Sequence, residues 1–404
     1  MAIKQLANIL IAKCNNIEEN NMNKKVIDFV QDIYETKDFI PLHAPTFIGN
    51  EKRYVLDTID TTFVSSVGKY VKDFEHLVEN YTGATKAVAT ANGTSALHAA
   101  LYVADIKAGE LVITQALTFV ATCNVLYHMG VEPIFVDVSK ISLGLCPKAT
   151  QEYLEANAKL NNDGECIHKT TGKKIKAVLP MHTFGHPVQL DELLVVCSEW
   201  NLLLVEDAAE SLGSFYKGRH TGTIGDFSAL SFNGNKIITT GGGGMVLCKT
   251  LDSGLRILHV TTTAKVPHPY EFYHDEPGFN YRLPNLNAAL GCAQMELLPK
   301  FIKQKRELAK LYAEFFYSSA YELFIEPEYA KSNYWLNSVL CPDINSRNLL
   351  LKATNEKGVM TRPIWQLMHR MPAFSNALKG DLTISEWAEA HLVNLPSSPP
   401  KLIT

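Results

Sequence analysis

The sequence predicts an α/β protein in which a large domain with a mainly parallel central sheet, flanked by helices, precedes a smaller α+β domain. From residue 45 to about residue 248, short apolar runs of strand length alternate with helical patterns. Such alternation implies parallel strands joined by right-handed helical crossovers. Beyond residue 256 the chain becomes rich in Pro, Asn and aromatic residues, and a long helical pattern follows. That change predicts a separate, smaller unit.

The predicted strands are short and rich in β-branched or aromatic residues, as buried strands are. They cover residues 86–90, 110–114, 131–138, 175–180, 201–207, 227–232 and 244–249. The helices predicted between them cover Thr94–Ala104, Thr118–Met129, Thr150–Leu160 and Leu190–Trp200. The polar segment 161–174 is typical of a surface hairpin or insertion. A long helix is predicted over 285–316, and the runs 334–340, 346–358 (helix-like) and 359–366 indicate the small α+β domain.

The division of the chain follows from these elements. We expect an N-terminal helical extension over 1–44, which includes the apolar run "LANILIA", and a large α/β domain over 45–255. Residues 256–404 then hold a connecting loop, the long helix and the small domain. The apolar run is too short for a signal peptide and no cleavage pattern follows it, so we interpret it as helix.

The composition is that of an ordinary globular protein with a large core. Hydrophobic residues make up 46% of the 404 residues, charged residues 20%, and the net charge is −4. These values argue against disordered, fibrous and strongly nucleic-acid-binding classes. No window reaches the roughly 18 apolar residues of a membrane span. The eight cysteines show no CxxC or finger-like spacing, so we expect no metal site and no disulfide framework, and a cytoplasmic location.

Three loops are expected to carry the chemistry, because ligands of parallel sheets bind beyond the carboxyl ends of the strands. They are "ANGTSA" after the first strand, "EDAAES" after the fifth and "NGNK" after the sixth. In the first loop, Gly93, Thr94 and Ser95 stand at a strand-to-helix turn, where free N–H groups bind phosphate. The same residues also make a good structural N-cap.

Asp207 and Lys236 are the titratable residues of the other two loops. Asp207 ends an apolar strand, and a buried carboxylate needs a cation or strong donors, so it faces a cationic ligand or serves as a cap or salt-bridge partner. Lys236 is a candidate nucleophile, or a solvated loop lysine. Together, a phosphate cup, a carboxylate and a lysine amine fit pyridoxal phosphate. Phe119 would stack on the cofactor ring, or is a core residue of a helix.

A nucleotide-binding P-loop is the alternative that the glycines at 241–244 suggest. No GxxxxGK[ST] motif exists, and Lys236 precedes the glycines rather than following them. We therefore interpret the glycines as backbone freedom for a tight turn beside the cofactor, before a strand entered at Met245.

The segments "NGTSALHAAL", "LTFVATCNVL", "VEDAAESLGS", "SFNGNKIITTGGGG" and "GFNYRLPNLNAALG" resemble the DegT-type sugar-nucleotide aminotransferases. The resemblance runs from about residue 39 to the C-terminus and implies the fold type I architecture of aspartate aminotransferase. "PLHAPTFIGNEKRYV", "PMHTFGHP" and "TTTAKVPHP" are similar to a subgroup that makes UDP-4-amino-4,6-dideoxy-N-acetylglucosamine for bacillosamine or legionaminic acid.

The resemblance implies roles residue by residue. Lys236 matches the lysine that binds the cofactor covalently, and Asp207 matches the partner of the ring nitrogen. Phe119 matches the stacking aromatic. Phosphate ligands are Thr94, Ser95 and Ser231, with Gly93 and Asn233 in the same cup and Asn280 supplied by the neighbouring subunit of a homodimer. Glu210 stands near the cofactor's phenolic oxygen, where many members have Gln or His. Segments bordering the substrate pocket contain His182, Phe184, Lys265, His268 and Arg282.

The implied reaction moves the amino group of L-glutamate to C4 of a UDP-linked 4-keto-6-deoxy-N-acetylhexosamine. Pyridoxal 5′-phosphate is the cofactor, pyridoxamine phosphate its aminated form, and 2-oxoglutarate the second product. Action at C3, or on a dTDP- or GDP-sugar, stays open. Related dehydratases carry His at the lysine position, so Lys236 favours transfer. A non-catalytic regulator that binds the cofactor is the alternative from another class, although no basic DNA-binding segment is evident.

Overall fold

The computed structural model describes residues 22–401, and the segment "LANILIA" lies outside this range. The central feature is an eight-stranded sheet with the order β1-β11-β10-β7-β6-β2-β3-β18. Its strands are β1 (Lys86–Thr90), β2 (Leu111–Gln115), β3 (Glu132–Val136), β6 (Ile175–Leu179), β7 (Leu203–Asp207), β10 (Phe227–Ser231), β11 (Gly244–Cys248) and β18 (Leu378–Lys379). All seven predicted strands are confirmed to within two residues at each end.

The sheet is mainly parallel, as predicted, with β11 as the exception. This strand pairs antiparallel with β1 on one side and with β10 on the other, while β10 and β7 are parallel. Strands β1, β10 and β7 therefore all end at the same edge of the sheet. Gly244 starts β11 at that edge, opposite Thr90 of β1 and Ser231 of β10. The three loops expected to carry the chemistry thus meet there.

The four helices predicted between the strands are present, and three of their ends are shifted by two or three residues. They are α4 (Gly93–Val103), α5 (Val120–His128), α6 (Pro147–Asn157) and α7 (Leu190–Glu199); a further helix, α8 (Leu251–Thr261), was not predicted. Helix α5 begins late because Phe119 is its extended N-cap, with φ −70° and ψ 143°. Helix α6 begins early because Pro147 suits a first helical position. It ends before β4 (Ala158–Leu160), which pairs with β5 (Cys166–His168) as the predicted surface hairpin.

Helices cover both faces of the sheet, because side chains of a strand alternate between the faces. On β1, Ala87 and Ala89 pack toward α3 (Lys69–Thr82) and the first half of α9 (Asn285–Phe316). Val88 packs on the other face, in the cluster formed by α4, α5 and α8. Helices α6 and α7 cover the β2, β3 and β6 end of the first face. The result is a three-layer α/β/α arrangement with its core on both sides of the sheet.

The C-terminal part is α+β, as predicted. It contains an antiparallel sheet with the order β14-β16-β19-β17. Its elements are β14 (Glu322–Leu323), β16 (Asn337–Leu340), α10 (Ile344–Glu356), β17 (Arg362–Pro363), α11 (Thr383–His391) and β19 (Leu392–Leu395). The long helix α9 has the predicted bounds. Among residues 22–401, no helix has the length and apolar character that a membrane crossing requires.

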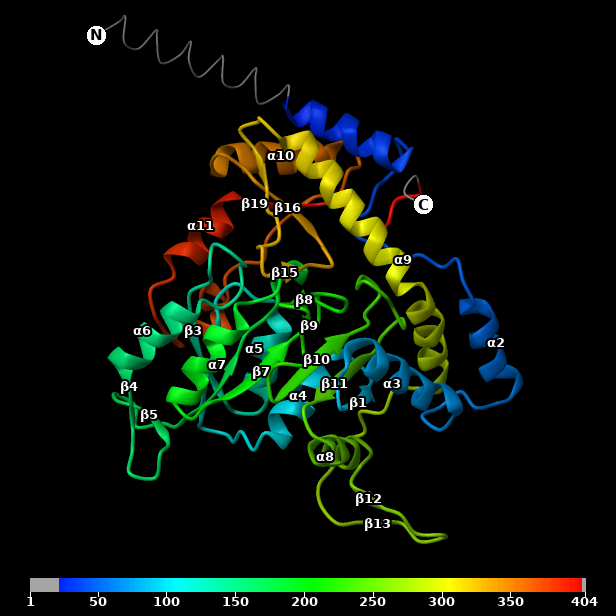
Figure 1. The fold of residues 1–404 in the computed structure, drawn as a ribbon, viewed down its shortest axis with the longest axis vertical. Helices are drawn as coiled ribbons and strands as arrows, with labels where there is room; N and C mark the ends of the chain where they lie inside the picture. The colour runs from blue at the N-terminus through cyan, green and yellow to red at the C-terminus, as the bar shows by residue number, and fades with distance from the viewer. Residues whose placement is uncertain (1–21, 402–404) are drawn as a thin grey trace, which may run out of the picture.

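The N-terminal helix at 22–34 packs on this C-terminal part rather than on the large sheet (Figure 1). Val26 and Val30 lie in one apolar cluster with Leu308 and Tyr312 of α9 and with Val339 of β16. Conversely, β18 leaves the C-terminal part and extends the large sheet beside β3. The boundaries at 44/45 and 255/256 stay a proposal.

The glycine run at 241–244 is required by close backbone contact as well as by a turn. Gly241 has φ +80°, which an L side chain rarely adopts. A Cβ on Gly244 would lie 2.3 Å from the carbonyl oxygen of Asn92 and 2.6 Å from the nitrogen of Gly93. The run therefore lets the start of β11 touch the start of α4, and β11 begins at Gly244, one residue before Met245.

We expect Gly244→Ala to destabilise the fold by about 1–3 kcal/mol, since the added methyl group meets rigid backbone on the neighbouring loop. Gly242→Ala is the matched control: a Cβ there has no heavy atom within 4 Å. It should change stability by less than about 0.5 kcal/mol. Thermal and urea unfolding of both variants measure the difference, and equal stabilities would contradict the packing argument.

Candidate active site

A cavity of about 290 Å³ opens at the edge where β1, β7 and β10 end. Its walls come from the loops after these strands, the start of α5, and two tryptophans of the C-terminal part. The lining residues are Asn92, Gly93, Thr94, Leu97, Phe119, Ala121, Met181, Asp207, Ala209, Glu210, Ser231, Asn233, Asn235, Lys236, Gly242, Gly243, Trp335 and Trp365. Eight of them were predicted as site residues: Gly93, Thr94, Phe119, Asp207, Glu210, Ser231, Asn233 and Lys236.

Lys236 and Glu210 form an ion pair at the cavity wall. Nζ of Lys236 donates to Oε1 of Glu210 at 3.2 Å. The Lys236 side chain is 11% exposed and that of Glu210 is 1% exposed. The amine also lies 4.2 Å from the centre of the Trp335 ring, within cation–π range. Lys236 is therefore a confined amine at a cavity, in contrast to the solvated loop lysine considered from sequence.

Glu210 is a buried carboxyl with a raised pKa. Burial raises its pKa to about 7, against the charge of Lys236 and a hydrogen bond from the Phe184 N–H, with Asp207 raising it further. The Phe184 N–H donates to Oε2 at 3.0 Å. Phe184 has φ +57°, a left-handed conformation that is costly for a bulky residue. The residue with the strained backbone is therefore the one whose N–H donates to Glu210.

Asp207 lies at the end of β7, three residues before Glu210, and is also buried. Its Oδ2 accepts from the Thr122 hydroxyl at 2.6 Å, and its Oδ1 accepts from the Ala209 N–H at 3.2 Å. In the described part of the chain, no cationic side chain forms an ion pair with it. The carboxylate is thus held by neutral donors and lines the cavity, where a cationic ligand atom would complete its environment.

The start of α4 lines the cavity beside the end of β10. First-turn N–H groups of a helix have no partner within the helix. Asn92 caps α4 by accepting the Ser95 N–H at 2.8 Å, while Gly93 and Thr94 line the cavity. A Cβ on Gly93 would lie 2.9 Å from Cβ of Ser231, so glycine allows the two loops to meet. Ser95, in contrast, does not line the cavity.

Phe119 stands at the cavity rim. It is 44% exposed, so the alternative of a core phenylalanine is wrong. Its ring makes an edge contact with Trp365, with centroids 6.0 Å apart and planes at 61°. Trp365 in turn packs on Phe184, with centroids 5.0 Å apart. Phe184 itself is fully buried and does not line the cavity, so it supports Trp365 and Glu210 from behind.

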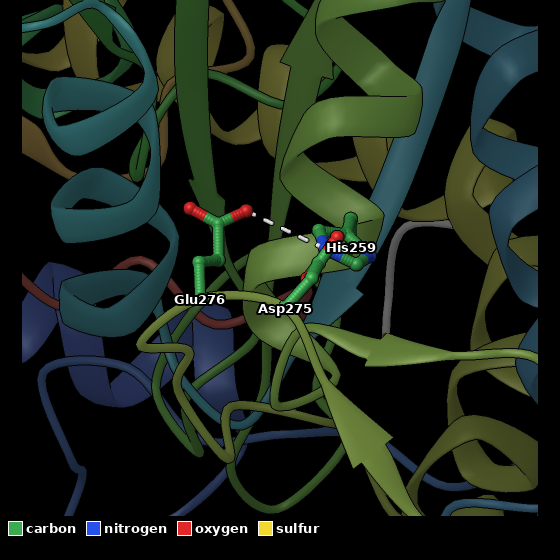
Figure 2. Close-up of side chains that lie close together, drawn as sticks. All are labelled: His259, Asp275 and Glu276. Atoms are coloured by element: carbon green, nitrogen blue, oxygen red, sulfur yellow. Dashed lines mark hydrogen bonds and ion pairs between the residues drawn. The ribbon is translucent and has the colours of Figure 1, made fainter.

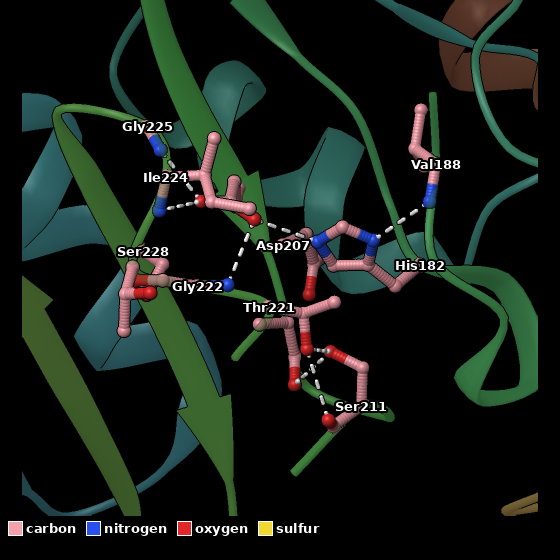
Figure 3. A network of polar contacts seen from close by, with 12 residues as sticks. His182, Val188, Asp207, Ser211, Thr221, Gly222, Ile224, Gly225 and Ser228 are labelled. Atoms are coloured by element: carbon pink, nitrogen blue, oxygen red, sulfur yellow. Dashed lines mark hydrogen bonds and ion pairs between the residues drawn. The ribbon is translucent and has the colours of Figure 1, made fainter. Parts of the chain in front are cut away.

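His182 has a structural role in this fold, and the predicted contact with the substrate is wrong. It is fully buried, and its Nδ1 accepts the Val188 N–H at 3.2 Å (Figure 3). The ring proton therefore sits on Nε2, which donates to Glu206 at 2.9 Å. Burial alone would raise the pKa of Glu206. The bonds from His182 and from the N–H groups of Gly225 and Gly222 outweigh burial and lower that pKa.

The remaining predicted residues gather elsewhere. Lys265, His268 and Arg282 line a separate open hollow of about 570 Å³. Asn280 lies beside it: its backbone pairs with Thr262, and its Oδ1 accepts from Nε of Arg282 at 3.2 Å. Within one chain, these four residues are not part of the cavity that holds Lys236.

Comparison with known proteins decides the family. A family model described as the DegT/DnrJ/EryC1/StrS aminotransferase family matches residues 45–401. The chain belongs to this family. GDP-perosamine synthase of Escherichia coli O157:H7 is 34% identical over 361 residues, covering 89% of this chain and 94% of that protein. GDP-perosamine synthase of Vibrio cholerae is 32% identical, with the same shares covered.

The fold agrees with solved structures of similar proteins. The aminotransferase TlmJ from Streptoalloteichus hindustanus superposes with a TM-score of 0.80 at 24% identity, covering 89% of this chain and 93% of that one. PseC of Helicobacter pylori, an aminotransferase involved in the biosynthesis of pseudoaminic acid, gives a TM-score of 0.78 at 22% identity, with 89% and 94% covered. As a DegT-family member, the chain is a pyridoxal-phosphate-dependent sugar aminotransferase. The expected fold type I architecture is confirmed.

The cavity of this aminotransferase fits pyridoxal phosphate. Gly93, Thr94 and Ser231 can hold the phosphate, because they line the cavity at the first turn of α4 and at the end of β10, where N–H and hydroxyl groups can donate to an anion. The Asp207 carboxylate, held by neutral donors, suits a protonated ring nitrogen. Lys236 offers a confined amine for covalent attachment, and Phe119 offers an exposed ring face at the rim. This donor set matches the cofactor in charge and in kind.

Two tryptophans of the aminotransferase site were not predicted. Trp335 and Trp365 line the cavity but follow Lys236 by about 100 and about 130 residues, respectively. Both stand in runs that were interpreted only as parts of a small domain. Asn92 and Asn235 were missed as well, although they flank predicted site residues within the same motifs.

A cluster of His259, Asp275 and Glu276 is the group in the described residues that has metal-ligand character (Figure 2). Nε2 of His259 lies 2.7 Å from Asp275 and 3.4 Å from Glu276. Glu276 also forms a two-pronged ion pair with Arg256. Because Arg256 already neutralises this carboxylate, we interpret the cluster as a salt-bridge network. It attaches the hairpin of β12 (Lys265–Val266) and β13 (Tyr273–His274) to α8.

Replacing Glu210 by Gln should alter how stability depends on pH. A carboxyl with a higher pKa in the folded state binds more protons there, so its contribution to stability falls as the pH rises. For Glu210 the window runs from its ordinary value of 4.5 to about 7. As the pH rises across that window, the free energy of unfolding of Glu210→Gln should increase by roughly 2–3 kcal/mol relative to that of the wild type. Thermal melts from pH 5 to pH 8 measure it.

The control is Glu152→Gln, which changes an exposed glutamate on α6. Its melting curve should follow that of the wild type at every pH. If Glu210→Gln also runs parallel to the wild type, the buried carboxyl does not titrate in this window.

Proposed function

We propose that this aminotransferase moves the amino group of L-glutamate to C4 of a UDP-linked 4-keto-6-deoxy-N-acetylhexosamine. The products are a UDP-4-amino-4,6-dideoxy-N-acetyl sugar and 2-oxoglutarate. The observation that carries the chemistry is the confined amine of Lys236, 3.2 Å from buried Glu210 and in one cavity with Asp207. An amine so placed can attach to the cofactor and transfer protons within the site.

The chain's own residues have separate tasks in this reaction. Bound pyridoxal phosphate supplies the electron sink. Nζ of Lys236 takes the proton from Cα of glutamate, and in the second half-reaction returns a proton to C4 of the sugar. Oε1 of Glu210 holds that amine, and the proton on this carboxyl exchanges near neutral pH because burial raises its pKa to about 7. The Asp207 carboxylate stabilises positive charge on the ring nitrogen.

The nucleotide and the substituent at C2 of the sugar are the open points of the proposal. The motifs at 41–55, 180–187 and 261–269 favour a UDP-linked N-acetyl sugar. Two relatives at 34% and 32% identity are GDP-perosamine synthases, which favours a GDP-linked sugar as the second candidate. Transfer at C3 and action on a dTDP-sugar stay as further alternatives.

We further propose a homodimer with shared active sites. Asn280 does not reach the cavity of its own chain, which suits a role in the partner's site. Exposed apolar side chains also crowd the segment 47–67. They are Phe47, Ile48, Leu56, Ile59, Phe63, Val64 and Val67, each at least 43% exposed. Seven exposed apolar residues within one segment of 21 residues are typical of an interface.

Turnover with a panel of 4-keto-6-deoxy sugars tests the substrate. Purified protein loaded with pyridoxal phosphate is given L-glutamate and the UDP-N-acetyl, GDP and dTDP forms, and 2-oxoglutarate and amino sugar are measured. We expect the highest kcat/KM for the UDP-linked N-acetyl sugar, with the new amine at C4. Highest kcat/KM for the GDP-sugar would replace the first candidate by the second. Lys236→Ala is the chemical control and should lose at least roughly 10³-fold in kcat.

Complementation tests the shared site. Lys236→Ala and Asn280→Ala should each be impaired alone. In a mixed dimer, the site with wild-type Lys236 receives the intact Asn280 of the other chain, so activity returns. If Asn280 served its own chain, neither site of the mixed dimer would be intact. Co-expression with two affinity tags isolates the mixed dimer, and its turnover distinguishes the two arrangements.

A further inference from the structure

A short segment of the C-terminal part, Asn333–Trp335, contacts both members of the Lys236–Glu210 pair. Asn333 is fully buried, and its amide Nδ2 donates to the carbonyl of Glu210 at 2.8 Å and to that of Leu212 at 2.9 Å. Asn333 therefore holds the backbone from which the Glu210 carboxyl extends.

Trp335 contacts the other member of the pair. Its indole Nε1–H donates to the carbonyl of Asn235, the residue before Lys236, at 2.7 Å. The face of the same ring lies 4.2 Å from Nζ of Lys236. One side chain thus holds both the backbone and the amine of the lysine.

The Asn333–Trp335 segment is itself firmly anchored. The Trp335 N–H donates to Oδ1 of Asn333 at 2.8 Å, and the Asn333 N–H donates to Oγ of Ser214 at 2.9 Å. The Trp335 carbonyl accepts from Nζ of Lys305 at 3.1 Å. Lys305 belongs to α9 and is fully buried. These bonds connect the segment to the large domain and to the long helix.

The loop that carries Lys236 needs such support. Residues 232–243 between β10 and β11 form turns and bends without regular structure. Asn233 and Asn235 are exposed, and nothing packs within 4 Å of a Cβ placed on Gly234. The loop is therefore exposed at residues 233 and 235, next to Lys236, and small displacements of a reacting group slow a reaction strongly.

We propose that Asn333–Trp335 is a positioning clamp that sets the distance between Lys236 and Glu210 from outside the large domain. Asn333 fixes the carboxyl side, and Trp335 fixes the amine side. Both act through other residues, so they are positioning residues. The clamp rests on the proposed attachment of the cofactor to Lys236.

Trp335→Phe is the informative variant, because it keeps an aromatic face for the amine and removes only the bond to Asn235. The cofactor-free protein is mixed with pyridoxal 5′-phosphate, and covalent attachment to Lys236 is followed by absorbance and located by borohydride reduction and mass spectrometry. The rate constant of attachment and kcat should each fall up to roughly tenfold, which is the effect of losing one hydrogen bond. KM for the amino donor should stay within about twofold, because the clamp acts on the lysine and not on substrate binding.

Two further variants complete the test. Trp335→Leu also removes the aromatic ring beside the amine. Its rate constant of attachment and its kcat should each be up to about tenfold lower than those of Trp335→Phe. Trp200→Phe is the matched control: its indole donates to Gln151 at 3.2 Å, outside the cavity, and both rates should equal those of the wild type.

Wild-type attachment and kcat in Trp335→Phe would overturn the clamp. A slowdown of equal size in Trp200→Phe would also overturn it, because the effect would then be general. If the wild-type protein fails to attach pyridoxal 5′-phosphate at Lys236, the proposed function fails and the clamp with it.

Discussion

The pairing of β11 between β1 and β10 is the constraint on which the site depends. Because β11 runs antiparallel to both neighbours, it lets two parallel strands end at one edge without lying side by side. The row Thr90, Gly244 and Ser231 then brings the start of α4 against the end of β10. Gly93 and Gly244 permit this contact because any Cβ would meet the neighbouring loop. The phosphate cup and the Lys236 loop are thus consequences of one strand register.

Two carboxyl groups three residues apart have opposite electrostatic settings at this edge. Asp207 has neutral donors and no ion-pair partner among the described residues, so a ligand cation would complete it. Glu210 has Lys236 as its partner, yet burial raises its pKa to about 7. One carboxyl is therefore suited to hold a lasting positive charge, and the other to exchange a proton with an amine. Neighbouring groups with such different settings are typical of acid–base sites.

Sequence reasoning succeeds where the determinants are local. The strands and the loops with Gly93, Asp207 and Lys236 are predictable because parallel strands place their following loops at one edge. It fails for Trp335 and Trp365, whose position depends on how the C-terminal part packs on the large domain. His182 illustrates the reverse error, because a histidine in a pocket-like motif is here the buried partner of Glu206. Asn280 and Arg282 lie outside the cavity of their own chain, beside Thr262 and Lys265, a placement that no local pattern shows.

Lys305 explains how the C-terminal part can act on the site with precision. A fully buried lysine is costly, and burial lowers its pKa well below the ordinary value. An apolar residue would fill the same space without that cost, but it would not supply the hydrogen bonds that the Lys305 amine donates. It donates to the carbonyls of Trp335 and Ser397, which ties the segment beside Lys236 to the chain end after β19. Burial and the charges of Lys305 and Lys236 lower the pKa of His43, so this neighbour adds no competing cation. Helix α9, the segment after β19 and the clamp are thereby connected to one another, and the clamp contacts the Lys236 amine.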